Sequence, residues 1–147
     1  MGGQEGVGDT DSISVRVSPA VESAALNSLF AAAWSEHTAH DFGPVLAQSL
    51  AYLCAYAEDE LVGFVNVAWD GGRHAFLLDP TVHPRYQRRG IGLRLVREAV
   101  RVASSRGVAW LHVDFVSELA AFYRAAGFRS TTAGLLQLPV ARDPLTP

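Results

Sequence analysis

An amphipathic helix that directly follows a strand and a glycine-bounded loop constrains the fold of this chain most. Its apolar positions are Ile91, Leu95, Ala99 and Val102, and its arginines are Arg94, Arg97 and Arg101. This 3.6-residue period predicts a helix over residues 91–105 that packs on a sheet, and Gly107 ends it. Because the strand predicted at 74–82 comes just before the loop, the chain is expected to combine a sheet with covering helices.

The other elements follow from the alternation of period-2 and period-3.6 segments along the chain. The predicted strands cover residues 13–17, 51–57, 61–69, 74–82 and 109–115, and a last hairpin pairs 128–132 with 135–140. The predicted helices cover residues 19–33, 43–50, 91–105 and 117–126. Ser18 is the expected N-cap of the first helix, because Pro19 follows it. This order predicts an α/β protein with a mixed sheet and helices on both faces.

Length and composition indicate one compact domain. The chain has 147 residues, of which 49% are hydrophobic and 18% charged, and this composition excludes an intrinsically disordered chain. We expect a flexible leader at 1–12, one domain at 13–140 and a flexible tail at 141–147. With no apolar run of ~20 residues and no signal-peptide pattern, we expect a cytoplasmic protein that does not enter the membrane. The single cysteine, Cys54, excludes an intrachain disulfide and is expected in the core.

Charge is distributed unevenly along the chain. Residues 1–79 hold eleven acidic and two basic side chains, a net charge of −9, whereas residues 80–147 hold ten arginines and four acids, a net charge of +6. A net-acidic protein with one basic segment is poorly suited to coat nucleic acid. It is better suited to bind one small anionic ligand.

The loop from Gln87 to Gly92 (Gln-Arg-Arg-Gly-Ile-Gly) lies between a predicted strand and a helix N-terminus. Free amides at a helix start and the positive end of the helix dipole attract phosphate oxygens, so we interpret the loop as a diphosphate site. It lacks the third glycine of a dinucleotide fingerprint and the Gly-Lys-Ser/Thr of a P-loop. Taken alone, the same pattern also fits an ordinary turn.

Two motifs resemble the GNAT superfamily of N-acyltransferases. The first is Val82-x-Pro84-x-Tyr86-Gln87-Arg88-Arg89-Gly90-Ile91-Gly92, which is similar to the family's acyl-CoA signature. The second is Ala121-Phe122-Tyr123-Arg124-x-x-Gly127-Phe128. The resemblance implies a mostly antiparallel, splayed sheet of about seven strands with helices on both faces.

The resemblance also implies a binding site for acetyl-CoA as cosubstrate, with no metal. Backbone groups at Thr81 and Val82 would pair with the pantetheine arm, and the amides from Arg88 to Leu93 would hold the diphosphate. The residues implied in binding are Thr81, Val82, Gln87, Arg88, Arg89, Gly90, Ile91, Gly92 and Leu93. The chain departs from the family at Val116, where many members carry an asparagine that binds the pantetheine.

Tyr123 resembles the tyrosine that donates a proton to the departing thiolate, and a phenol with a pKa of ~10 is protonated at neutral pH. We expect Phe122 rather than Tyr123 to fill the core. Asp79, His112 and Asp114 are alternative bases that would take the proton of the amine. Asp79 stands alone, because Leu78 occupies the position where some relatives carry a second acid.

The predicted linker 34–42 contains two histidines, two acids and two aromatic residues, and in this fold it walls the acceptor pocket. We expect an acidic, aromatic entrance that favours a small cationic amine, and a metal site at His37 and His40 is the less favoured alternative. Three functions therefore stay open: acetyl transfer to a small amine, acetyl transfer to a protein N-terminus or lysine, and acyl-CoA binding without catalysis. Exposed sheet edges also favour a homodimer.

Overall fold

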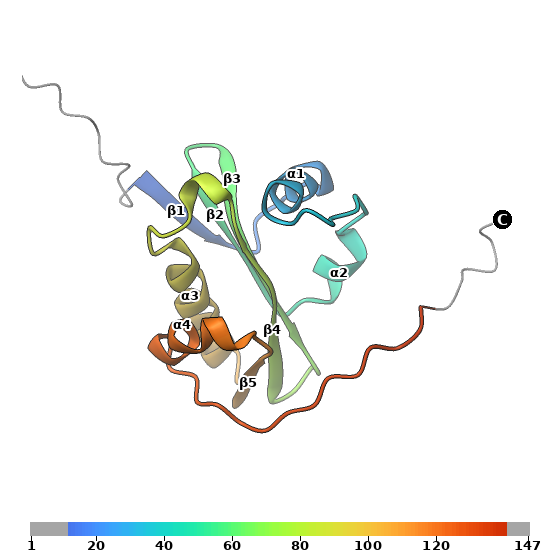
Figure 1. Ribbon diagram of the computed structural model, residues 1–147, viewed down its shortest axis with the longest axis vertical. Helices are drawn as coiled ribbons and strands as arrows, with labels where there is room; N and C mark the ends of the chain where they lie inside the picture. Colours follow the sequence, from blue (N-terminus) through green and yellow to red (C-terminus); the bar gives the residue numbers. More distant parts are fainter. Residues whose placement is uncertain (1–11, 141–147) are drawn as a thin grey trace, which may run out of the picture.

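The computed structural model describes residues 12–140, and these form one five-stranded sheet with helices on both faces (Figure 1). The strands lie side by side in chain order: β1 (Ile13–Val17), β2 (Ala51–Ala57), β3 (Glu60–Trp69), β4 (His74–Val82) and β5 (Trp110–Val113). Strands β1 to β4 are antiparallel, and β5 is parallel to β4. The predicted α/β fold with a mixed, mostly antiparallel sheet is confirmed. The flexible leader and tail predicted for the two ends of the chain concern residues 1–11 and 141–147, which lie outside the described residues.

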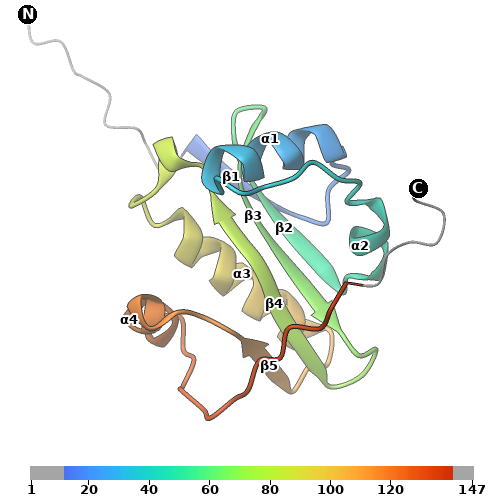
Figure 2. The same cartoon turned by 45° about the vertical axis from the view of Figure 1, so that its right-hand side comes forward.

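The helices divide between the two faces of the sheet. They are α1 (Ser23–Ala33), α2 (Gly43–Gln48), α3 (Ile91–Ser105) and α4 (Ala120–Ala125), with short 3-10 turns at η2 (Pro84–Tyr86) and η3 (Ser117–Leu119). Helices α1 and α2 cover one face, and α3 and α4 lie on the other (Figures 1 and 2). Within residues 12–140, none of the helices has the length and apolar character needed to cross a membrane.

The two faces of the sheet build two hydrophobic cores, and β2 contributes alternately to each. Leu53 and Ala55 join the core under α3, whereas Cys54 and Tyr56 join the core under α1. This alternation is what the period-2 pattern of a strand requires. The predicted core position of Cys54 is confirmed, and burial raises the pKa of its thiol to about 12.

A glycine in β3 lets the first turns of α3 approach the sheet closely. A Cβ atom at Gly63 would lie 2.8 Å from Cδ1 of Leu95 and 3.1 Å from Cβ of Ala55. Because Gly63 pairs with Val82 at the end of β4, this contact places the N-terminus of α3 beside the end of that strand.

The predicted start of the first helix is wrong. Ser18 has a left-handed φ of 47°, and its N–H donates to the carbonyl of Tyr52 at 2.7 Å, so Ser18 extends the pairing of β1 with β2. The helix begins only at Ser23, with Glu22 as its N-cap. A hydrogen bond to a distant strand outweighs the local capping pattern here.

The predicted hairpin of residues 128–132 with 135–140 does not form, so the sheet has five strands rather than about seven. Residues 128–140 contain no strand and no turn, and β5 ends at Val113 rather than at residue 115. Figure 1 shows this segment, in red, running below β5 and away from the sheet. A period-2 pattern specifies an extended backbone but does not specify a partner strand.

Candidate functional site

The sheet opens between β4 and β5. The two strands pair only where His74–Leu77 lies beside Trp110–Val113, whereas β4 remains paired with β3 as far as Val82. From Leu78 onward, the β5 side of β4 therefore has no neighbouring strand in the sheet. Backbone donors and acceptors along such an edge are available to an extended ligand.

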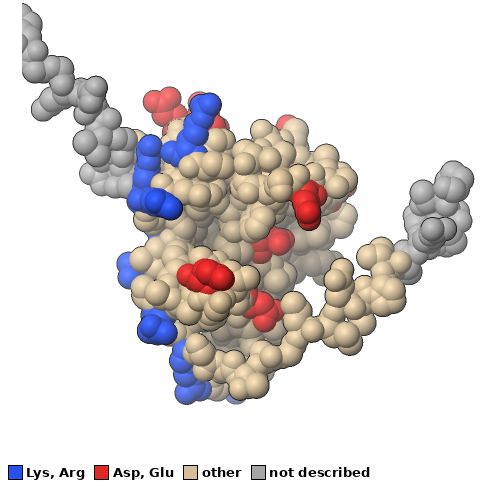
Figure 3. Space-filling model, viewed as in Figure 1, with Lys and Arg blue, Asp and Glu red and all other residues tan. Residues whose placement is uncertain are grey.

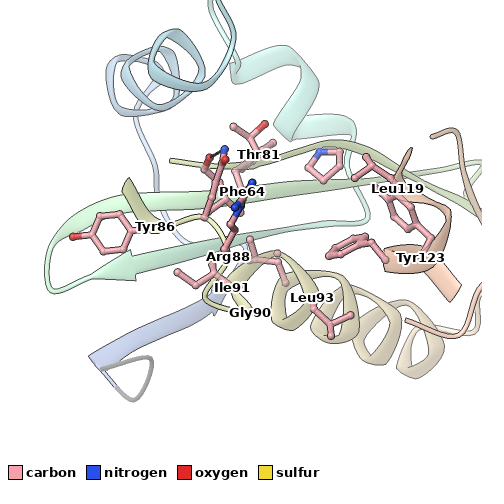
Figure 4. Close-up of a pocket in the computed structure, with 15 residues that line it drawn as sticks. Phe64, Thr81, Tyr86, Arg88, Gly90, Ile91, Leu93, Leu119 and Tyr123 are labelled. Atoms are coloured by element: carbon pink, nitrogen blue, oxygen red, sulfur yellow. Dashed lines mark hydrogen bonds between the residues drawn. The ribbon is translucent and has the colours of Figure 1, made fainter. Parts of the chain in front are cut away.

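A cavity of about 650 Å³ occupies this opening (Figure 4). It is lined by β3 and β4, the loop before α3, the first turns of α3, η3 and α4. The lining residues are Phe64, Pro80, Thr81, Val82, Tyr86, Gln87, Arg88, Gly90, Ile91, Gly92, Leu93, Leu95, Leu119, Phe122 and Tyr123. The cavity therefore brings together Tyr123 and every residue predicted to bind acetyl-CoA except Arg89.

A β-bulge shapes the β4 wall of the cavity. Two residues, Asp79 and Pro80, lie between the paired positions Leu78 and Thr81, whereas the facing stretch of β3 contributes one, and Asp79 has a left-handed φ of 54°. The Thr81 hydroxyl donates to the carbonyl of Asp79 at 2.9 Å and accepts the indole N–H of Trp34 at 3.1 Å. Trp34 is the C-cap of α1, so these two hydrogen bonds tie the bulge to that helix.

The loop before α3 presents free backbone amides. Gly90 is the N-cap of α3 with φ of 79°, and Arg88 is also left-handed with φ of 62°. The first bond of the helix runs from the N–H of Arg94 to the carbonyl of Gly90 at 3.0 Å. Within residues 12–140, no backbone acceptor is recorded for the amides from Arg88 to Leu93. Converging amides at the positive end of a 15-residue helix suit an anion.

Basic side chains surround this loop. Arginine side chains gather along one side of the molecule, that of α3 and the loop before it (Figure 3). The guanidinium of Arg89 lies 5.2 Å from the centre of the Tyr86 ring, a cation–π contact that holds the side chain outside the cavity. Arg88, in contrast, lines the cavity (Figure 4).

Tyr123 fills a core position and lines the cavity at the same time. Its side chain is 2% exposed and stacks on Phe115 at 4.8 Å, so the expectation that Phe122 would take the core position instead is wrong. Burial raises the pKa of Tyr123 above 10.0. No hydrogen bond is recorded for its hydroxyl among the described residues, yet none of their buried polar side-chain atoms lacks a partner. The hydroxyl therefore retains accessible surface, and the cavity supplies it.

The three candidate bases lie in different surroundings, and none of them lines the cavity. Asp79 sits at the bulge, next to Pro80 and Thr81 of the cavity wall, and burial raises the pKa of its carboxyl, while nearby His40 partly lowers it. His112 lies farther along the sheet, where its ring stacks on Phe76 at 4.6 Å. A nitrogen of His112 also lies 3.0 Å from a nitrogen of His74. Asp114 is exposed just beyond the end of β5.

The segment between α1 and α2, residues 34–42, is held against α1 by Asn27. The amide of Asn27 bonds to the backbone of His40 and to the ring of His37. The carboxylate of Asp41 accepts from the N–H of Gly43 at 2.8 Å and from the hydroxyl of Ser23 at 3.2 Å, so it fixes the turn before α2. Across the described chain, no three His, Cys, Asp or Glu side chains are grouped so that they could hold a metal ion.

Several site residues were not predicted from the sequence. Phe64, Pro80, Leu119 and Phe122 line the cavity. Trp34, which fixes the bulge, belongs to the linker 34–42 that was predicted to wall the acceptor pocket. Pro80 carried a detectable signal, because a proline within a strand indicates a free edge or a bulge. The other residues join the site only through the opening between β4 and β5.

The mixed sheet splays open between β4 and β5, and the loop between β4 and α3 presents free backbone amides. These two features together define an acyltransferase-like fold. Residues 22–128 match the family model described as "Acetyltransferase (GNAT) family". The chain belongs to this family, and the resemblance inferred from the two motifs is confirmed.

Individual relatives agree with this assignment. The chain is 26% identical to a GNAT family acetyltransferase structure from Streptococcus pneumoniae TIGR4, with a TM-score of 0.71 over 89% of this chain and 99% of that one. It shares the fold of aminoglycoside N-acetyltransferase AAC(6')-Iy in complex with CoA, with a TM-score of 0.69, 18% identity, and coverage of 88% and 95%. It is 35% identical to mycothiol acetyltransferase of Nocardia farcinica (strain IFM 10152) over 63 residues, which are 43% of this chain and 21% of that protein. This chain spans between 21% and 34% of the length of the curated relatives it matches.

Proposed function

We propose that this protein is an N-acetyltransferase that transfers the acetyl group of acetyl-CoA to a primary amine of a small cationic molecule. One observation carries the proposal: a single cavity joins the unpaired edge of β4, the free amides before α3 and the Tyr123 side chain. Family membership supports it, as does the shared fold of an aminoglycoside acetyltransferase in complex with CoA.

The cavity has the polar groups that acetyl-CoA requires. The unpaired edge of β4 at Thr81 and Val82 offers backbone groups to the pantetheine arm, and the amides from Arg88 to Leu93 offer donors to the diphosphate. The carbonyl of Val82 accepts from Nε2 of Gln87 at 3.1 Å and keeps a second lone pair for a ligand. Val116 is 62% exposed at the N-cap of η3 and offers no polar side-chain contact.

Direct transfer in a ternary complex forms a C–N bond, breaks the C–S bond, removes a proton from the amine and returns a proton to the thiolate. We assign the proton donor to Tyr123, because burial keeps the phenol protonated beside the cavity. We assign the base to Asp79, directly or through water, because Asp79 directly precedes Pro80 and Thr81 of the cavity wall and burial raises the pKa of its carboxyl. His112 and Asp114 are less suited, since His112 contacts His74 and Asp114 is exposed beyond β5.

The preference for a small cationic amine rests on the segment between α1 and α2. His40 of this segment is close enough to Asp79 to affect the pKa of the carboxyl, so the segment borders the side of β4 from which an amine would approach. The carboxylate of Glu36 is exposed there, and that of Asp41 fixes a turn. Glu36→Gln is therefore the cleaner test of an acidic entrance, and we expect it to raise the KM for the amine. An unchanged KM would contradict an acidic entrance.

We also propose that the protein is a homodimer.

Calorimetric titration with acetyl-CoA tests the proposed function, with desulfo-CoA and ATP as comparison ligands. We expect saturable binding of acetyl-CoA and desulfo-CoA and no binding of ATP, followed by release of free thiol when a library of small amines is added. Absence of acetyl-CoA binding would overturn the proposal. Binding without thiol release from any amine would instead indicate an acyl-CoA-binding domain without catalysis.

A further inference from the structure

Strands β4 and β5 carry a group of exposed apolar and aromatic side chains. Phe76 and Leu78 of β4 are each 42% exposed, and Trp110 of β5 is 55% exposed. His112 of β5 is exposed as well. We call these four residues the β4–β5 patch. Exposed apolar side chains that are grouped in this way mark an interaction site in a folded protein.

The register of the strands places the β4–β5 patch on the face of the sheet that α1 and α2 cover. Leu78 pairs with Asn66 of β3, whose side chain accepts a hydrogen bond at 2.5 Å from the C-cap serine of α2. Phe76 lies two residues before Leu78 and pairs with His112, so both rings share that face. Trp110, two residues before His112, shares it too.

Stacking and hydrogen bonding hold the rings of the β4–β5 patch in place. The ring of His112 stacks on that of Phe76, with centroids 4.6 Å apart and planes 17° from parallel. A nitrogen of His74 lies 3.0 Å from a nitrogen of His112, within hydrogen-bond distance. A surface whose side chains are already fixed loses little conformational entropy when it binds a ligand.

The β4–β5 patch is continuous along β4 with the proposed catalytic site. Leu78 is followed by Asp79 and then by Pro80 of the cavity wall. Burial raises the pKa of the Asp79 carboxyl, and nearby His40, in the segment between α1 and α2, partly lowers it, so the carboxyl lies on the side of α1 and α2. Phe76 precedes Asp79 by three residues, which span ~10 Å at ~3.3 Å per residue. A molecule whose amine meets Asp79 can therefore place an apolar group on Leu78 and Phe76.

The charges around the β4–β5 patch suit a cation. Asp79 follows Leu78 at one end of the patch, and Asp114 is exposed just beyond the end of β5. Arginine side chains gather instead on the side of α3, which packs on the other face of the sheet (Figure 3). A protonated amine is therefore attracted to the carboxylates, while the patch offers an apolar surface to the rest of the molecule.

We propose that the β4–β5 patch binds an aromatic group of the acceptor, so that the substrate is a primary amine with an aromatic body rather than a polycationic or polyhydroxylated amine. This inference rests on the proposed acetyl transfer and narrows its class of acceptor. An aromatic ring buries a large apolar area and packs well against other rings. A second ammonium or a hydroxyl group would lose water on this surface without gaining a hydrogen-bond partner.

Two amines with the same chain length test the proposal. Phenylbutylamine and diaminobutane each carry a primary amine at the end of a four-carbon chain, and they differ at the other end, which is a phenyl ring or a second amine. Thiol release from acetyl-CoA measures kcat/KM for each amine. We expect kcat/KM to be about tenfold or more higher for phenylbutylamine, and Phe76→Ala to remove most of this preference.

Three outcomes would overturn the proposal. Equal kcat/KM for the two amines would do so, and so would a preference for diaminobutane. A wild-type preference in Phe76→Ala would show that the ring binds elsewhere. In each of these cases thiol is released, so the acetyl transfer itself stands. Absence of thiol release from any amine would instead overturn the proposed acetyl transfer, and this inference with it.

Two further variants separate the β4–β5 patch from a general effect on the sheet. Leu78→Ser removes the apolar contact next to Asp79 and should reduce the preference as Phe76→Ala does. Trp69→Ala removes an aromatic side chain of similar exposure, 37%, on the opposite face, since Trp69 pairs with Ala75, and should keep the preference.

Calorimetric titration and molar mass complete the comparison of the three variants. None of the three residues lines the cavity, so we expect wild-type affinity for acetyl-CoA, which shows that each variant is folded. Light scattering after gel filtration measures the molar mass. If Phe76→Ala kept the amine preference and lowered the molar mass, the patch would be a contact between copies of the chain and the proposal would be wrong.

Discussion

At the scale of single residues, Tyr123 combines rigidity with access to the cavity. Phe115, Phe122 and Phe128 pack around its ring, so the hydroxyl has a fixed position at the cavity wall. Because burial raises its pKa above 10.0, deprotonation of Tyr123 removes the acid only in strongly alkaline solution. A fixed phenol that stays neutral in this way is suited to protonate a departing thiolate.

The first prediction is that Tyr123→Phe lowers kcat by about 10²–10⁴-fold, the usual contribution of a general acid. The affinity for acetyl-CoA should stay within about twofold of the wild type, because the substitution removes only a hydroxyl without a protein partner. Thiol-release kinetics and calorimetry measure the two effects. Tyr52→Phe is the matched control: its hydroxyl bonds to the carbonyl of Pro19, outside the cavity, and we expect unchanged kcat. A Tyr123→Phe enzyme with wild-type kcat would exclude Tyr123 as the acid.

The second prediction concerns Asp79 and the pH dependence of kcat. A base must be deprotonated, so activity should fall as the pH drops through the pKa of Asp79. Burial raises that pKa above 3.8. The fall of kcat on the acid side of the pH profile, the acid limb, should therefore lie at higher pH than an ordinary aspartate would give. Asp79→Asn should lower kcat and remove this limb, and asparagine tolerates the left-handed φ of 54° at the bulge. His112→Gln should keep the limb, and its loss in that variant would identify His112 as the base instead.

At the scale of elements, the placement of α3 depends on Gly63. The N-terminus of α3 places the free amides beside the end of β4. This placement is possible because Gly63 has no side chain, so Leu95 of α3 packs in the space that a Cβ at position 63 would occupy. The packing of one helix against one strand therefore sets the geometry of the anion-binding loop.

The third prediction is that Gly63→Ala destabilises the protein by about 1–3 kcal/mol, the usual cost of overpacking a core. The Leu95 side chain can move away, but Cβ of Ala55, at 3.1 Å, moves only with its strand. Shifting α3 should also weaken acetyl-CoA binding. Chemical denaturation and calorimetry measure both effects, with Gly72→Ala, in the exposed turn after β3, as the matched control. Equal stability of the two variants would show that β3 and α3 adjust without cost.

The elements also show what a single sequence can predict. The bounds of β1, β2, β4 and α3 agree with the predicted ranges, because each has a glycine or a polar turn at its end. The amides before α3 were predicted as well, since the spacing of Gly90 and Gly92 is a local signal. Phe64 and Leu119 were missed as cavity residues, because they meet only where β4 and β5 diverge. Strand divergence is a property of long-range pairing, which the sequence of one strand does not encode.

At the scale of the whole molecule, charge is segregated in space as well as along the chain. The arginine-rich half of the sequence, residues 80–147, contains α3 and the loop before it, and the arginines that the structure describes gather on that side of the molecule (Figure 3). The protein as a whole has a net charge of −3. An anionic ligand therefore experiences an attractive local potential on a molecule that would repel it at long range.

The last prediction follows from this segregation. Raising the salt from about 0.05 M to 0.5 M shortens the screening length from more than 10 Å to a few Å, so acetyl-CoA should bind several-fold more weakly. Arg88→Gln should reduce this salt dependence, because Arg88 lines the cavity. Arg106→Gln removes the same charge at the C-cap of α3, about 22 Å along the helix at 1.5 Å per residue, and should leave the salt dependence unchanged. Calorimetry at several salt concentrations measures all three proteins. If the Arg88 and Arg106 variants lost equal affinity, overall charge rather than the loop would govern binding.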